Sequence, residues 1–65
     1  MEFFIYFIIP GERPLFPLVE KIDADTAESA FARFSKLYPE YLIDGILILD
    51  EDEGKFMPVT IDPHN

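Results

Sequence analysis

Apart from its carboxylates, few side chains in this 65-residue sequence are of the types that carry out acid–base or nucleophilic chemistry. There is no cysteine, and the single histidine, His64, is the second-last residue. A catalytic base must be held rigidly within hydrogen-bond reach of its substrate, so we interpret His64 as a solvated tail residue. No activated nucleophile is recognisable around the hydroxyl side chains, which are Thr26, Ser29, Ser35 and Thr60. We therefore expect no enzymatic activity, no cofactor and no thiolate metal site.

Carboxylates are the reactive groups in excess: 13 Asp and Glu residues stand against 5 Lys and Arg, which gives a formal net charge of −8. Four of them are consecutive, namely Asp50, Glu51, Asp52 and Glu53. An EF-hand calcium loop needs oxygen ligands at positions 1, 3 and 5 and glycine at position 6. With Gly54 at position 6, position 1 falls on Leu49, so we expect no metal site of this kind. Three interpretations of the run stay open: loose cation binding, solvation of a hydrophobic protein, or recognition of a basic partner.

The negative charge gathers in the C-terminal part of the chain. Residues 39–65 hold seven acidic side chains and one base, Lys55. A field of one sign steers and orients a partner of the opposite charge, so we expect a protein partner with a basic surface. The predicted contact residues are Asp44, Asp50, Glu51, Asp52 and Glu53, with Phe56 as a hydrophobic anchor. The same charge argues against direct binding of nucleic acid, which needs Lys and Arg at the phosphates, and against docking on anionic lipid.

Four segments that must position these residues are predicted strands: residues 2–9, 18–23, 46–49 and 55–60. The first and third, EFFIYFII and ILIL, are apolar on both alternating faces, which is typical of strands in the middle of a covered sheet. The acidic run forms a hairpin turn, with Gly54 at a positive φ, and we place a second turn at Asp44-Gly45. Pro58 cannot donate a ladder hydrogen bond, so the last strand is expected at a sheet edge.

Residues 25–38 carry the pattern of an amphipathic helix. Their apolar side chains recur at three- and four-residue spacing and make one stripe. Asp25 can cap the first turn, and Glu28 completes a capping box. Pro39 ends the helix, because proline disfavours helical geometry at the residue before it.

The element order is therefore β-β-α-β-β, and we predict one α+β domain over residues 1–65, with residues 61–65 as a frayed tail. The two doubly apolar strands should lie side by side, which gives a four-stranded, mainly antiparallel sheet in the order 2-1-3-4. One helix covers only one face of such a sheet, so the apolar side chains of the other face need a partner. The apolar run at residues 3–9 is too short to span a membrane and lacks the features of a signal peptide. We therefore expect a cytoplasmic protein that does not bind membranes.

Two hypotheses about function follow. The first is a non-enzymatic, acidic protein-binding module that inhibits or modulates a larger, basic target, such as a nucleic-acid-binding protein. The second is a structural or accessory subunit, or a homodimer, joined through the second apolar sheet face. The layout resembles that of short phage-encoded or accessory proteins that act by binding, and no motif is specific enough to name a family. Phe16 and Tyr41 are expected to pack beneath their loops, with a role as interface anchors as the alternative.

Overall fold

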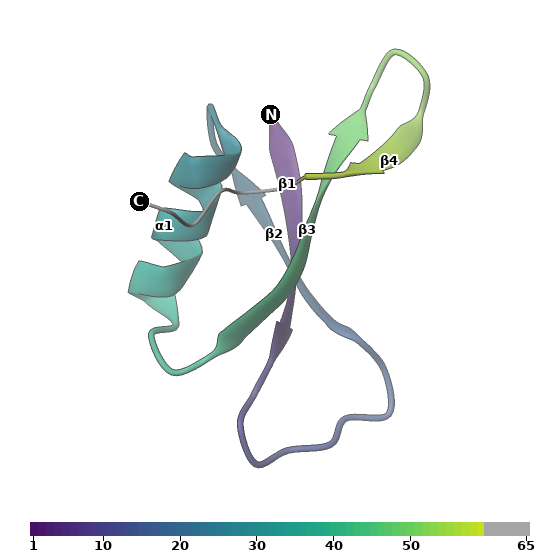
Figure 1. Cartoon of the computed structure of the whole chain (residues 1–65). Helices are drawn as coiled ribbons and strands as arrows, with labels where there is room; N and C mark the ends of the chain where they lie inside the picture. Colours follow the sequence, from purple (N-terminus) through teal and green to yellow (C-terminus); the bar gives the residue numbers. More distant parts are fainter. Residues whose placement is uncertain (60–65) are drawn as a thin grey trace.

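The computed structural model describes residues 1–59, and its elements follow the predicted order β-β-α-β-β (Figure 1). The five elements are β1 (Glu2–Ile8), β2 (Leu18–Asp23), α1 (Ala27–Leu37), β3 (Leu42–Asp50) and β4 (Lys55–Pro58). All three strand pairs are antiparallel, and the sheet order is β2-β1-β3-β4. This confirms the predicted α+β fold, with the two doubly apolar strands in the middle of the sheet. The predicted tail, residues 61–65, lies outside the described residues and so does His64.

The core lies between α1 and one face of the sheet, because alternate residues of a strand point to opposite faces. Phe3 of β1 is paired with Ile22 of β2, and Ile5 of β1 with Ile46 of β3. All four side chains are buried, and the fully buried Phe34 of α1 belongs to the same cluster. The helix therefore covers the face of β1 on which odd-numbered residues lie.

α1 begins later than the sequence suggests, and the predicted Asp25–Glu28 capping box is wrong. The N-cap is Thr26, whose Oγ1 accepts a hydrogen bond from the Ser29 N–H at 3.0 Å. Asp and Thr are both good capping types, and a cap residue needs an extended backbone, which Thr26 has with φ −137° and ψ 163°. At its other end the helix stops before Pro39, as predicted.

β3 is longer than predicted, and the predicted turn at Asp44-Gly45 is wrong. Both residues lie within the strand and beside β1, where Tyr6 is paired with Gly45 but Phe7 with Ile43. Asp44 is thus the extra residue of a β-bulge, a feature that bends a strand and re-aims its side chains. An Asp-Gly dipeptide favours turns locally, but pairing with β1 outweighs that preference.

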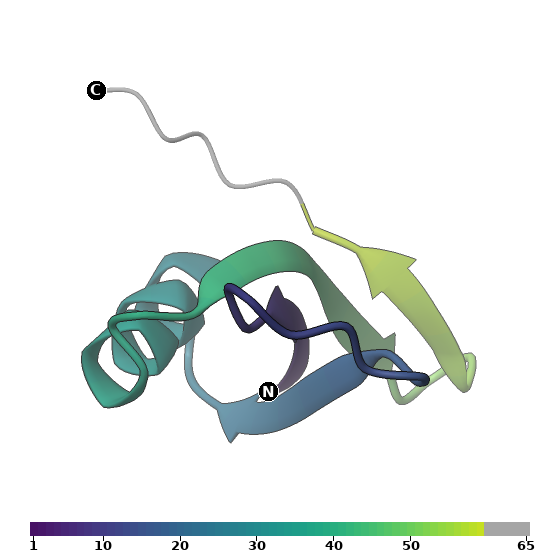
Figure 2. The same cartoon turned by 90° about the horizontal axis from the view of Figure 1, so that it is seen from below.

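The hairpin between β3 and β4 is as predicted, with Gly54 at φ +68° in its turn. β4 lies at a sheet edge, which agrees with the position of Pro58. In Figures 1 and 2, α1 lies on one side of the sheet, while the hairpin and the loop between β1 and β2 project away from the helix. Among residues 1–59, no helix covers the second face of the sheet. Within residues 1–59, no helix is long and apolar enough to cross a membrane.

Candidate protein-binding surface

The sheet face opposite α1 is largely apolar, as two doubly apolar strands predict, with the charged residues Glu2, Lys21 and Asp23 at its β2 end. Phe4 of β1 is paired with Leu47 of β3, and Leu49 of β3 with Phe56 of β4. Residues paired across antiparallel strands lie on the same side of the sheet, and these residues alternate along their strands with those that face the helix. The apolar residues of this face, hereafter the open face, are Phe4, Tyr6, Ile8, Val19, Leu42, Leu47, Leu49 and Phe56. Exposed apolar patches of this kind are typical of interaction sites.

Phe56 joins the hairpin to the open face. Its ring meets the ring of Phe4 edge to face, with the centroids 5.1 Å apart and the planes at 83°, a favourable geometry for an aromatic pair. Phe56 nevertheless stays 55% exposed. The structure thus places the predicted anchor at the β4 edge of the open face, accessible to another protein.

The consecutive carboxylates Asp50–Glu53, hereafter the acidic turn, form the tip of the hairpin. Asp50 builds this turn, because its backbone carbonyl accepts from the Gly54 N–H at 2.7 Å and its Oδ1 accepts from the Asp52 N–H at 3.0 Å. The Glu53 carboxylate lies 3.6 Å from the Lys55 Nζ, and both side chains are mostly exposed, so this ion pair contributes little stability. Glu51 and Asp52 form no ion pair with any of residues 1–59. Together with Asp50, which also forms no ion pair within residues 1–59, they carry the uncompensated negative charge of the turn.

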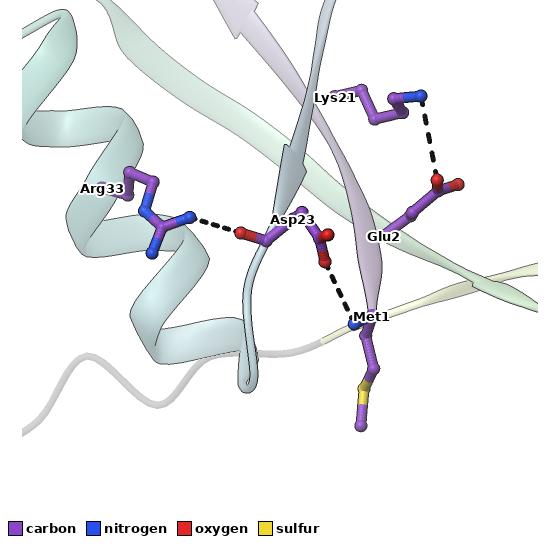
Figure 3. A network of polar contacts seen from close by, with 5 residues as sticks. All are labelled: Met1, Glu2, Lys21, Asp23 and Arg33. Carbon is purple, nitrogen blue, oxygen red and sulfur yellow. Dashed lines mark hydrogen bonds and ion pairs between the residues drawn. The ribbon is translucent and has the colours of Figure 1, made fainter.

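Polar contacts at the start of β1 engage the bases at that end of the sheet (Figure 3). The amino group of Met1 lies 3.2 Å from Asp23 Oδ1, and Lys21 Nζ lies 3.8 Å from Glu2 Oε2. Arg33 of α1 donates a hydrogen bond to the backbone carbonyl of Asp23. Lys21 and Arg33 are therefore engaged within β1, β2 and α1 and form no ion pair with the acidic turn.

Asp44, the remaining predicted contact residue, lies apart from the acidic turn. It is six positions from Asp50 along β3, which corresponds to about 20 Å at the rise of a strand. Asp44 instead lines a recess of about 340 Å³ together with Tyr6 and Phe16. The predicted contact residues thus form two groups, namely the acidic turn with Phe56, and Asp44 alone.

The two aromatic loop residues differ in their packing. Tyr41 packs as expected, with its ring parallel to that of Phe7 and the centroids 5.3 Å apart. The prediction is wrong for Phe16, which is 78% exposed, and its neighbour Leu15 is 92% exposed. Sequence reasoning missed Leu15 altogether. The available signal was the proline on either side of Leu15 and Phe16. Each proline fixes a backbone angle, and a stiff loop can hold apolar side chains away from the core.

Residues 1–59 contain no group of three or more His, Cys, Asp or Glu side chains placed to hold a metal ion. Comparison with known proteins adds no lead: the sequence matches no family model, no curated protein and no solved structure. The function must therefore be inferred from the chemistry of the surface itself.

Proposed function

We propose that the chain is a non-enzymatic protein-binding module, which docks on a larger protein with a basic surface and inhibits or modulates it. The docking surface is the open face together with the acidic turn. The observation that carries this proposal is the packing of Phe56 on Phe4. It joins an exposed apolar face to the most acidic segment of the chain in one surface, and an apolar centre with a polar rim is the usual anatomy of a protein interface.

The open face supplies the binding energy in this proposal. Tyr6 and Phe56 are aromatic, and aromatic residues at the centre of an interface often dominate its energetics. They lie on paired strands, so little backbone freedom is lost when a partner covers them. A rigid apolar surface of this kind favours a partner that presents an apolar stripe of its own.

The acidic turn selects the partner. A basic surface is attracted by the net charge of −8, whereas an acidic one is repelled. Exposed charges act more on the rate of association and on its orientation than on affinity. A second copy of the chain is the alternative occupant of the open face, as in a homodimer or an accessory subunit, and it would add a further net charge of −8 to the complex. The charge therefore favours a basic partner.

Synthetic peptides of equal length provide the test. The first is an amphipathic helix with a basic polar face, the second has the same apolar stripe with an acidic polar face, and the third is the basic peptide in scrambled order. Calorimetry should detect binding of the first peptide alone. Phe56→Ser should weaken binding about tenfold or more, as expected for an interface anchor. The double variant Glu51→Lys/Asp52→Lys should weaken it by a smaller factor and reduce its salt dependence.

The matched control for the charge reversal is Glu28→Lys/Glu40→Lys, which changes the net charge by the same amount in the first turn of α1 and in the loop after it, and should affect binding far less. Equal binding of the scrambled peptide would reduce the interaction to unspecific charge attraction and end the proposal. A second result would also end the proposal. If the chain runs at twice its 7.5 kDa mass on a sizing column and the Phe56→Ser variant runs as a monomer, a second copy of the chain occupies the open face.

A further inference from the structure

The recess beside the open face is distinct in its chemistry from the rest of the surface. Its volume is about 340 Å³, and its lining includes Tyr6 and Ile8 of β1, Phe16 and Pro17 of the loop between β1 and β2, Leu18 of β2, and Asp44 of β3. Ligand pockets span about 300–1,000 Å³, so this one lies at the small end of the range. It has room for one long side chain but not for a helix.

The residues that line the recess are apolar or aromatic except for Asp44, which also borders a smaller depression on the α1 side with Phe31 and Ile43. Aromatic faces attract cations, and the methylene stems of Lys and Arg cover apolar surface while their charged ends reach a polar group. Asp44 is the only charged side chain in the lining. The occupant that satisfies both parts of the recess is therefore a side chain with an apolar stem and a positive end.

Asp44 is available for such a partner. The three ion pairs among residues 1–59 involve Asp23, Glu2 and Glu53, and Asp44 takes part in none of them. Its side chain is exposed, and it is the extra residue of the β-bulge between β1 and β3. Bulges recur next to functional sites, where they re-aim a side chain.

The loop forms the other wall of the recess. It projects beyond the end of the sheet where β1 ends and β2 begins (Figure 1), and Pro14 and Pro17 restrict its backbone on both sides of Leu15 and Phe16. Those two residues are the most exposed large apolar side chains in the described part of the chain, at 92% and 78%. A partner seated on the open face lies beside this wall, because Tyr6 and Ile8 belong to both surfaces.

We propose that the recess binds the side chain of an arginine or lysine of the basic partner, with its stem against Tyr6 and Phe16 and its charge at Asp44. This inference rests on the proposed function and names the feature of the partner that the chain recognises. It also gives Asp44 a role separate from that of the acidic turn.

The probes for the test are N-acetyl-arginine amide and N-acetyl-lysine amide, with N-acetyl-norleucine amide as the uncharged control. In a titration followed by amide chemical shifts, the cationic probes should move the signals of Tyr6, Phe16 and Asp44. Norleucine amide should move them far less at the same concentration. Asp44→Asn, which keeps the shape of the side chain, should weaken binding of the cations about fivefold, the upper range for an exposed ion pair.

Asp52→Asn is the matched control, because it removes the same charge at the acidic turn and should leave the titration unchanged. Phe16→Ala alters an exposed wall residue, so it should weaken binding without affecting folding. Equal shifts with norleucine amide, or an Asp44→Asn variant that binds as tightly as the original chain, would overturn the inference. The proposed function is tested independently by the peptide assay, since the basic amphipathic peptide can bind the open face whether or not the recess binds a cation.

Discussion

The assignment of opposite roles to the two sheet faces can be tested with two adjacent residues of β3. Ile46 is 5% exposed and belongs to the core beneath α1, whereas Leu47 is only partly buried and lies on the open face between Phe4 and Pro58. Ile46→Ala removes buried methylene groups and leaves a cavity, which costs about 3 kcal/mol. Leu47→Ala removes a similar volume from a half-covered site and should cost about 1 kcal/mol. A domain of this size has a total stability of about 3–10 kcal/mol, so the first loss is close to the limit that the fold tolerates.

Urea denaturation followed by circular dichroism measures both losses. With a slope of about 1 kcal/mol per molar urea for a small domain, the midpoint should fall by about 3 M for Ile46→Ala and by about 1 M for Leu47→Ala. Equal losses would refute the distinction between a covered and an open face. A loss for Leu47→Ala that grows with protein concentration would show that a second copy of the chain covers this face, because oligomer stability depends on concentration.

Two further predictions concern backbone positions in α1 and the hairpin, each with its own control. Thr26→Ala removes the acceptor of the Ser29 N–H and should cost about 1 kcal/mol in thermal unfolding, whereas Asp25→Ala should leave the cap intact. Gly54→Ala places a side chain at φ +68° and should cost about 1 kcal/mol in the same assay. Gly45→Ala has open space around the new methyl group and no positive φ, so it should be close to neutral. A cost for Gly45→Ala equal to that for Gly54→Ala would contradict this reasoning.

The strand order was predictable because the hydrophobic pattern separates two strands from the other two. Only two segments are apolar on both alternating faces, and such segments must lie in the middle of a sheet. Pro58 assigned β4 to an edge, and the chain order then left β2 for the other edge. The existence of an uncovered face was predictable from the number of helices, since one helix cannot cover both faces of a four-stranded sheet.

The details that were missed depend on competition between local preference and tertiary contact. The Asp44-Gly45 dipeptide favours a turn in isolation, but pairing of Tyr6 with Gly45 holds it in the strand. Asp25 and Thr26 are equally suited to cap a helix, and a difference of one residue between them has no sequence signal. The exposure of Phe16 could not be read from its type, because an aromatic residue in a loop is buried or exposed according to where the loop projects. The recess at Asp44 depends on two of these three features.

Salt dependence distinguishes the two occupants of the open face, because its sign is opposite for each. Two copies packed face to face would have their centres about one molecular thickness apart, and the shortest extent of the chain is 19 Å. If each copy is treated as a point charge of −8, the screened repulsion is about 7 kcal/mol at 0.01 M salt and about 1 kcal/mol at 0.15 M. The net charge therefore does not forbid a homodimer at physiological salt, but such a dimer must tighten steeply as salt is added. Binding of a basic partner must weaken over the same range, since screening removes an attraction instead of a repulsion. An association through the open face that strengthens with salt is self-association, and one that weakens with salt is recognition of a cationic surface.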